Sequence, residues 1–548
     1  MLRTKVLIVG GGSVGLFTAL FLARHGIEAL VVEAQPEPSV HPRATGLGPR
    51  TLEFLREAGV LAAVDAVAVD MSEGNLGKLS AVNLASANLA GLPEAAPARS
   101  HRRSDPVTPA AIRGTCPQHR LDSVLLPAAT QGGATVRYGT RLLSFEQDAD
   151  GVTAHLDDGQ TIRADYLVAA DGVHSGVRKA LDIDTTGPGA LGNPKMNILF
   201  HADLRPYTQG RQFVACDITT PDAPGILMTV DGAKEWVFHS DYHPERGESA
   251  DDYTIDRCRE LIRAAIGDPE LDPRIVSRLS WRARGSVAER FRHGRVFLVG
   301  DAAHAVPPLG AFGLNTGAAD AHNLAWKLAA VLVGAADPAL LDTYDAERRP
   351  VAANTLTQAL LRLKAPRLHW DSSPVAAAER AAMGILDAPI VHMGYRYDSA
   401  AVIEPQPKLP STEDIELVLD GTPGSRLPHA WVARNGNRHS TLDLVRSRFT
   451  LLVGRDSVAW PRAAQQVADR LLVPLPVVVI EARDWPQRVG ITDRGALLVR
   501  PDQIVAWRAP TTPADPADDL TRALAQVLGR TVAQRDLPVS DRHVGGTL

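Results

Sequence analysis

The first 180 residues contain several short apolar runs and one segment with the apolar spacing of a helix. A β-branched run at 5–9 predicts a buried strand, and the apolar spacing at 13–25 predicts a helix that begins after a cluster of glycines. The run 28–34 predicts a second strand that ends at Glu33. Residues 135–172 predict a meander of short strands joined by Asp-Gly turns. Together these elements predict an α/β unit.

From about 185 to 285 the pattern changes to that of a sheet with one helix. The predicted strands are 212–218, 225–232 and 235–242, and the predicted helix is 254–267. A buried strand at 294–301 and a long apolar-periodic helix at 315–334 then resume the earlier character. We therefore expect a discontinuous nucleotide-binding domain, residues 1–182 and 285–365. A substrate-binding sheet domain, residues 183–284, would be inserted into it and cover a pocket.

The last third of the chain has a different organisation. Residues 366–424 are rich in Pro, Ala and Ser and predict a helical or linker region. Residues 425–548 predict the order strand, helix, strand, hairpin and helix, which is that of a thioredoxin-like domain. This stretch contains no cysteine, so thiol redox chemistry is excluded for it.

Composition narrows the class of protein. A length of 548 residues suggests about three domains. The chain is 45% hydrophobic and 22% charged, as in soluble globular proteins, and its net charge of −5 gives no indication of nucleic acid or anionic lipid as a partner. Cys116, Cys216 and Cys258 lack zinc-like or CxxC spacing, so we expect reduced thiols, a cytoplasmic protein and no metal site.

The stretch from Lys5 to Arg24 carries no charge between its ends, which raises the question of a membrane segment. With the basic residues in front it is similar to an export signal, and it is nearly long enough to span a bilayer. Four glycines argue against this, because each weakens a helix interior by about 1 kcal/mol relative to Ala. A glycine-rich turn without a ligand is the other alternative.

The spacing Gly10-x-Gly12-x-x-Gly15 favours a nucleotide site over both alternatives, because it lies between a predicted strand and a predicted helix. In that fingerprint Gly10 permits the tight turn, Gly12 lets a pyrophosphate approach the backbone, and Gly15 lets the helix lie close to the strand. The helix N-terminus supplies N–H donors. Glu33 stands near the position expected of the carboxylate that binds a ribose hydroxyl.

A second stretch, "YLVAADGVHSGVRKAL", places Asp171 at the end of another predicted strand. There its carboxylate can face a nucleotide, and Arg178 can add a positive charge for phosphates. The alternative is an ordinary strand–turn–helix connection in which Ser175 and its neighbours bind nothing.

A third stretch, "RVFLVGDAAHAVPPLGAFGLNTG", ends a buried strand at Asp301. A carboxylate there is costly unless it is hydrogen-bonded, and the hydroxyls of a ribityl chain would satisfy it. The loop that follows contains stiffening prolines and permissive glycines, and the next helix would direct its positive end at a flat ligand such as a reduced flavin. His304 is a candidate base, although a packed core histidine is the favoured interpretation.

These three stretches, in this order, resemble the class A flavoprotein monooxygenases of the para-hydroxybenzoate hydroxylase superfamily. That family carries GxGxxG, then DGxxSxVR, then GD followed by a PPxG…GxN loop, and "YDAERRPVA" at 344–352 resembles its closing motif. The resemblance implies a Rossmann-like FAD-binding domain, with NAD(P)H, preferably NADPH, and O₂ as co-substrates. Ala311 stands where relatives often carry a second glycine, a change expected to matter little.

The resemblance also implies the residues that bind FAD. Pro308 and Gly310 would flank the flavin, and the cofactor-binding set is Gly10, Gly12, Gly15, Glu33, Arg43, Gln118, Asp171, Asp301, Pro308, Gly313, Leu314 and Asn315.

Residues 41–47, 314–328 and the cysteine-free tail are similar to one branch, the aromatic polyketide hydroxylases. This implies hydroxylation of a polycyclic phenolic substrate through a flavin C4a-hydroperoxide. A phenol activates its own ring, so no catalytic side chain is required. Candidate residues of the substrate wall are Phe213, Met228, Trp236 and Phe238, for which the core of the inserted sheet is an equally good assignment.

Two alternatives to the hydroxylase remain open. One is a Baeyer–Villiger oxygenase that acts on a similar polyketide. The other is a non-catalytic relative that binds flavin or ligand, which the intact GD motif argues against. The WxWxIP motif of flavin halogenases is absent. His239 and His243 lack partner carboxylates, so they are expected at the surface or in the pocket wall rather than on a metal. We expect a monomer or a homodimer, with no nucleic acid or membrane partner.

Overall fold

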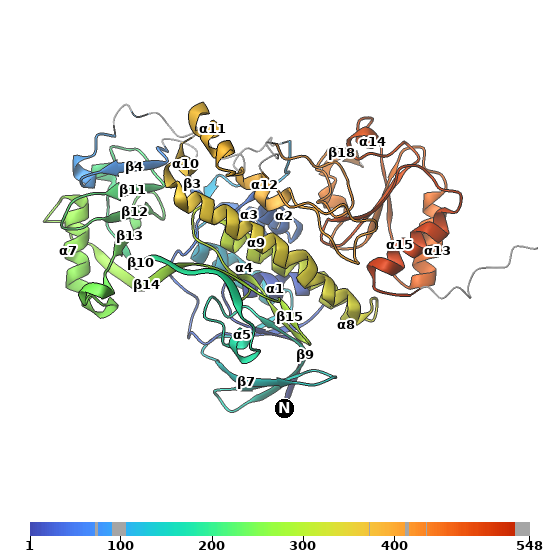
Figure 1. Ribbon diagram of the computed structural model, residues 1–548, viewed down its shortest axis with the longest axis horizontal. Coiled ribbons are helices and arrows are strands. Elements are labelled where there is room, and N and C mark those ends of the chain that lie inside the picture. Colours follow the sequence, from blue (N-terminus) through green and yellow to red (C-terminus); the bar gives the residue numbers. More distant parts are fainter. Residues whose placement is uncertain are drawn as a thin grey trace, which may run out of the picture.

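The computed structural model describes residues 1–71, 75–89, 92, 106–371, 373–411, 416–434 and 436–531. Figure 1 shows a central part, a sheet with its own helix at one side, and a C-terminal domain at the other. The long helices α8 (Phe312–Leu332) and α9 (Asp342–Lys364) cross the centre. The predicted mixed α/β class is confirmed.

A mostly parallel sheet forms the core of the central part. In spatial order its main strands are β15 (Arg292–His293), β16 (Val296–Leu298), β9 (Thr161–Ala169), β1 (Leu2–Val9), β2 (Ala29–Val32) and β6 (Thr135–Arg137). Strand β1 runs parallel to both β2 and β9, and its last four residues are buried. Such continuous apolar runs suit a parallel sheet that is covered on both faces. The predicted meander consists of β7 (Leu142–Gln147), β8 (Val152–Leu156) and β9.

Helices pack on this sheet. The predicted helix at 13–25 is α1 (Ser13–Arg24), which contacts both α8 and α4 (Gln118–Gln131). The remaining helices of this part are α2 (Pro49–Glu57), α3 (Leu61–Val67), α5 (Gly176–Ala180), α10 (Pro366–Trp370), α11 (Pro374–Ala382) and α12 (Ala388–Met393). Within the described residues, no helix combines the length and the apolar character needed to cross a membrane.

The second sheet contains two unusually long strands. Its order is β17 (His304–Ala305), β14 (Arg274–Ala288), β10 (Thr185–His201), β13 (Glu235–Asp241), β12 (Gly225–Thr229), β11 (Ala215–Ile218) and β4 (Lys78–Ala81). Helix α7 (Ile255–Ile266) packs on one face of this sheet. Edge strand β4 pairs with β11, so a segment of the first 182 residues contributes to this sheet. The domain limits given above stay predictions.

The C-terminal domain has the predicted thioredoxin-like order. Its sheet is β21 (Val477–Ile480), β20 (Thr450–Gly454), β22 (Ala496–Val499) and β23 (Val505–Ala509), with α13 (Trp460–Leu471), α14 (Trp485–Arg488) and α15 (Pro516–Val527). Strands β20 and β21 are parallel, whereas β22 is antiparallel to both of its neighbours. Two short pairs complete the structure: β3 (Val69–Asp70) with β5 (Gly114–Thr115), and β18 (Trp431–Arg434) with β19 (Asn437–Ser440).

The C-terminal domain is bonded to the central part through the tip of its β22–β23 hairpin. Arg500 donates to Glu347 of α9 from Nη1 (2.6 Å) and Nη2 (2.9 Å), and Lys327 of α8 donates to the same carboxylate (2.8 Å). All three side chains are fully buried. On α2, Arg50 donates to Gln503 Oε1 (2.6 Å) and to the carbonyl of Asp502 (2.8 Å). The hairpin tip therefore joins α2, α8 and α9.

Candidate active site

Four parallel strands end side by side at one edge of the central sheet, in the order β16, β9, β1 and β2. Shortly after their ends come Asp301, Asp171, Gly10 and Glu33, respectively. Adjacent strands lie about 4.8 Å apart, so the structure brings all three predicted stretches to one row. Ligands of open α/β sheets bind at this carboxyl edge.

The glycines of the first turn differ in what surrounds them. Gly10 has φ +108°, and a Cβ there would lie 2.2 Å from the carbonyl oxygen of Ala170. A Cβ at Gly15 would lie 2.0 Å from the carbonyl oxygen of Gly10, so the helix and the strand approach closely. A Cβ at Gly12 would meet nothing within 4 Å. Gly12 therefore faces open space at the N-terminus of α1, where a pyrophosphate can approach the backbone.

Glu33 lies directly against this turn. Its Oε2 accepts from the backbone N–H of Gly11 (2.7 Å), and its Oε1 accepts from that of Gln35 (2.8 Å). The Tyr138 hydroxyl donates to the carbonyl of Gly11 (3.4 Å). The carboxylate thus fixes the turn, and its remaining lone pairs are available to a ribose hydroxyl.

Asp171 has one oxygen in use and one without a partner. Oδ2 accepts from the Val177 N–H (3.1 Å), whereas the buried Oδ1 has no partner among the described residues. Burial raises the pKa of this carboxyl. Arg178 donates to the carbonyls of Ala302 (2.8 Å) and Val173 (3.2 Å). It therefore joins the second and third stretches, and its role toward phosphates stays a prediction.

Asp301 is exposed by surface area, yet protein surrounds it closely enough to desolvate its carboxyl and raise the pKa. The nearby charges of His304 and Arg43 offset part of this effect. The carboxylate therefore faces open space within a crowded site. His304 is buried, with Nε2 2.6 Å from Asp320 Oδ2, which supports the packed interpretation over the catalytic one.

The Asn315 side chain forms several hydrogen bonds within the protein. Its buried Oδ1 accepts from the Gly48 N–H (2.7 Å) and the Thr51 hydroxyl (2.7 Å), and its Nδ2 donates to the carbonyls of Gly46 (3.1 Å) and Ala311 (2.5 Å). The side chain thus holds the loop before α2 against residues 308–315, the predicted flavin loop. The predicted contact of Asn315 with the cofactor stays a prediction.

The other predicted residues lie around this loop. A Cβ at Gly313 would come within 4.0 Å of Asp301 Oδ1, so the flavin loop reaches the strand edge. Ala311 has φ +54°, a left-handed conformation that costs a non-glycine residue about 1 kcal/mol. The Gln118 N–H donates to the Ala44 carbonyl (2.7 Å), so α4 begins beside the segment that carries Arg43. Pro308, Gly310 and Leu314 belong to the same loop and helix start.

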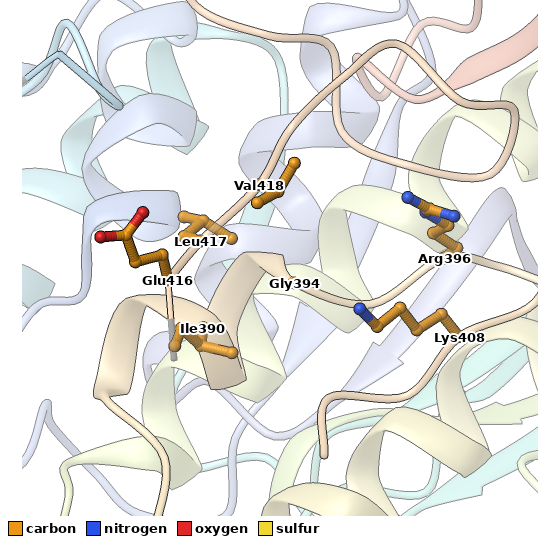
Figure 2. A pocket seen from close by; sticks show the side chains of 7 residues that line it. All are labelled: Ile390, Gly394, Arg396, Lys408, Glu416, Leu417 and Val418. Carbon is orange, nitrogen blue, oxygen red and sulfur yellow. The ribbon is translucent and has the colours of Figure 1, made fainter. Parts of the chain in front are cut away.

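Helix α12 packs against this loop. The sequence did not predict this contact. Phe312 is buried, and its ring centroid lies 5.3 Å from that of His392. Burial lowers the pKa of His392 to about 4, so the imidazole is neutral at pH 7. Beside α12 lies a small hollow lined by Ile390, Gly394, Arg396, Lys408, Glu416, Leu417 and Val418 (Figure 2). Ile390 contributes both to this hollow and to the apolar cluster around Phe312.

The residues at the strand edge fit an FAD. The open space at Gly12 suits a pyrophosphate, and the unpartnered oxygen of Asp171 and the accessible carboxylate of Asp301 suit hydroxyl groups. Residues 3–359 match the family described as FAD binding domain. Residues 420–531 match aromatic-ring hydroxylase, C-terminal. The chain belongs to the FAD-dependent aromatic hydroxylases.

Relatives of this hydroxylase match over nearly the full length. It is 40% identical to tetracenomycin A2 monooxygenase-dioxygenase of Streptomyces glaucescens, over 96% of this chain and 97% of that one. It is 39% identical to aklavinone 12-hydroxylase of Streptomyces purpurascens, over 96% and 99%. Among solved structures it is similar to aklavinone-11 hydroxylase in complex with FAD and aklavinone, with a TM-score of 0.83, 37% identity and coverage of 97% and 100%.

Three of the four residues predicted for the substrate wall are core residues of the hydroxylase. Phe213, Trp236 and Phe238 are at most 1% exposed and pack in the cluster that includes α7. Alternation along a strand explains the error, because the sequence does not show which face of the sheet α7 covers. Met228 alternates with the buried Leu227 of that cluster and so points to the opposite face.

Asp122 of α4 also lies beside the start of α1, and the sequence pattern did not identify it. It accepts a hydrogen bond from the hydroxyl of Ser13 at the start of α1. Burial raises the pKa of Asp122 to about 6, and the Ser13 hydrogen bond and the charge of Arg43 offset part of the rise. A usable signal existed, because residues four apart share a helix face and Asp122 follows Gln118 at that spacing. Among the described residues, no cluster of three or more His, Cys, Asp or Glu could hold a metal.

Proposed function

We propose that this protein hydroxylates a polycyclic aromatic substrate of the polyketide phenol type, with NADPH as the favoured reductant. The observation that carries the proposal is the joint presence of a strand edge that fits an FAD and near full-length similarity to polyketide hydroxylases. The FAD, when bound, supplies the redox chemistry that links NADPH, O₂ and the aromatic ring.

The chain's own residues would bind the FAD, orient the reacting groups and shield them from water. The turn at Gly12 would hold the pyrophosphate, and Asp171 and Asp301 would accept from hydroxyl groups of the cofactor. Helix α8 begins at the flavin loop, so the positive end of its dipole would stabilise negative charge on the reduced ring. Helix α12 and the second sheet would exclude water from the reacting atoms. Cys116, Cys216 and Cys258 are free buried thiols, which supports the proposed cytoplasmic location.

The test is anaerobic reduction of the FAD-loaded protein by NADPH and by NADH, with and without a panel of phenolic polycycles. We expect one class of polycycle to accelerate reduction and the aerobic product to contain one added oxygen. NMR of that product distinguishes a new ring hydroxyl from oxygen inserted beside a ketone. Flavin that binds but is reduced by neither nicotinamide, with any ligand, would contradict the proposal and support a binding protein.

A further inference from the structure

The second sheet carries polar side chains beside the apolar Leu199 and Val237 on the face opposite the one that α7 covers. On β10 and β13 the residues of the core cluster alternate with residues of the opposite face. Two residues of that opposite face, Asn197 and His239, lie directly opposite each other across the two strands. Trp281 of β14 lies next to them, with its ring 6.1 Å from that of His239 and nearly perpendicular to it. Three neighbouring strands thus place two polar side chains and one indole on a single patch.

This patch faces the FAD-binding part of the molecule. On β13, Glu235 shares the face of His239 and accepts from Arg120 Nη2 at the start of α4 (3.1 Å). Lys195 of β10 and His41, in the segment before Arg43, both act on His239 electrostatically. The patch of Asn197, His239, Trp281 and His41 therefore lies between the sheet and the segments that form the cofactor site.

Polar atoms of this patch are buried without partners. Among the described residues, no hydrogen bond reaches Asn197 Oδ1, His239 Nδ1, Trp281 Nε1 or either ring nitrogen of His41. His41 is 4% exposed and Asn197 is 5% exposed. Folded proteins pair nearly all buried polar groups, and an unpaired group keeps its full desolvation cost. A concentration of unpaired groups on one patch indicates that a ligand supplies the partners.

The protonation state of the patch limits the class of ligand that it can bind. Burial lowers the pKa of His41 to about 4 and that of His239 to about 3, with smaller contributions from neighbouring cations and histidines. Both imidazoles are therefore neutral at pH 7, and each offers one donor and one acceptor. Asn197 adds an acceptor and Trp281 a donor. This set complements hydroxyl and carbonyl groups.

We infer that Asn197, His239, Trp281 and His41 bind the hydroxyl- and carbonyl-bearing edge of a polycyclic aromatic substrate. The inference rests on the proposed function and assigns its substrate recognition to the face of the sheet opposite α7. The apolar residues Phe213, Trp236 and Phe238 support that sheet from behind.

The test compares two ligands on the FAD-loaded protein by flavin absorbance and tryptophan fluorescence. One is a dihydroxyanthraquinone whose hydroxyls flank one carbonyl, and the other is anthracene, which has neither hydroxyl nor carbonyl groups. Asn197→Leu and His239→Phe should each weaken binding of the dihydroxy compound by about tenfold. Binding of anthracene and of FAD should stay unchanged. His155→Phe on β8 is the matched control and should alter neither ligand.

A second measurement separates recognition from structure. Because the polar atoms have no partner in the protein, replacing them with apolar groups should leave the thermal midpoint of the ligand-free protein unchanged or raise it. A lower midpoint, equal weakening of both ligands, or no weakening would overturn the inference. If the wild-type protein binds neither ligand, the proposed substrate class fails as well. If reduction is stimulated by a polycycle that binds the variants as tightly as the wild type, only this inference fails.

Discussion

At the scale of single residues, we predict contrasting effects on stability for alanine substitution at Gly12 and at Gly15. Gly12 has φ −77°, and a Cβ there touches nothing, so Gly12→Ala should leave the stability of the FAD-free protein unchanged. The new methyl group occupies the space of the pyrophosphate, and the affinity for FAD should fall at least about tenfold. Gly15→Ala places its Cβ on the Gly10 carbonyl and should lower stability by about 1–3 kcal/mol. FAD titration and thermal unfolding of both variants measure this contrast, and equal FAD affinity in Gly12→Ala and wild type would contradict it.

Asp122 predicts a specific pH dependence of stability. Burial raises its pKa from an ordinary 3.8 to about 6, so folding favours the neutral carboxyl. The stability that this preference provides is present below about pH 4 and is lost as the pH rises to about 6, a loss of about 3 kcal/mol. Asp122→Asn stays neutral and keeps an acceptor for Ser13. Its free energy of unfolding should therefore exceed that of wild type by an amount that grows across this pH interval and stays constant above it.

Urea unfolding of wild type and Asp122→Asn between pH 4 and 8 measures that advantage. The same substitution at the exposed Asp150 should give no comparable change. An advantage that is independent of pH would show that the carboxyl does not titrate in this interval.

At the scale of elements, Asn315 connects the flavin loop to α2. Asn315→Leu leaves the Gly48 N–H and the carbonyls of Gly46 and Ala311 without partners and should cost at least about 3 kcal/mol. Thr51→Val removes one hydrogen bond to the same side chain and should cost about 1 kcal/mol. FAD should dissociate faster from Asn315→Leu than from Thr51→Val, as measured by flavin fluorescence. Equal rates would show that the connection does not support the cofactor site.

The sequence predicted elements best where the pattern is local. The fingerprint strand, turn and helix at 5–25 and the α/β order of the C-terminal domain were predicted because apolar period and glycines define them. Strands β10 and β14 were not assigned, because glycines and prolines interrupt the first and arginines recur along the second. Asp171 and Asp301 were identified because they follow buried runs. The hydrogen bond between Asn315 and Thr51 joins residues 264 positions apart, which no local pattern contains.

At the scale of the whole molecule, the buried ion pairs around Arg500 predict that the C-terminal domain supports the FAD-binding part. Arg500→Met leaves Glu347 and Asp502 buried without their main partner and should cost about 3–5 kcal/mol. Arg522→Met is the matched control, because Arg522 also pairs with two carboxylates of this domain but lies at the surface, where such pairs contribute little. Thermal unfolding followed by flavin fluorescence should show early FAD release only in Arg500→Met. Identical release from both variants would contradict a supporting role.

The hairpin tip also has a consequence for how the chain is made. A ribosome synthesises Glu347 153 residues before Arg500, which forms two hydrogen bonds to it. Until the hairpin has left the exit tunnel, α8 and α9 present charged groups to an empty interface. The FAD-binding part therefore completes its folding late in synthesis, and a nascent chain that stops before residue 500 exposes this interface to chaperones and proteases.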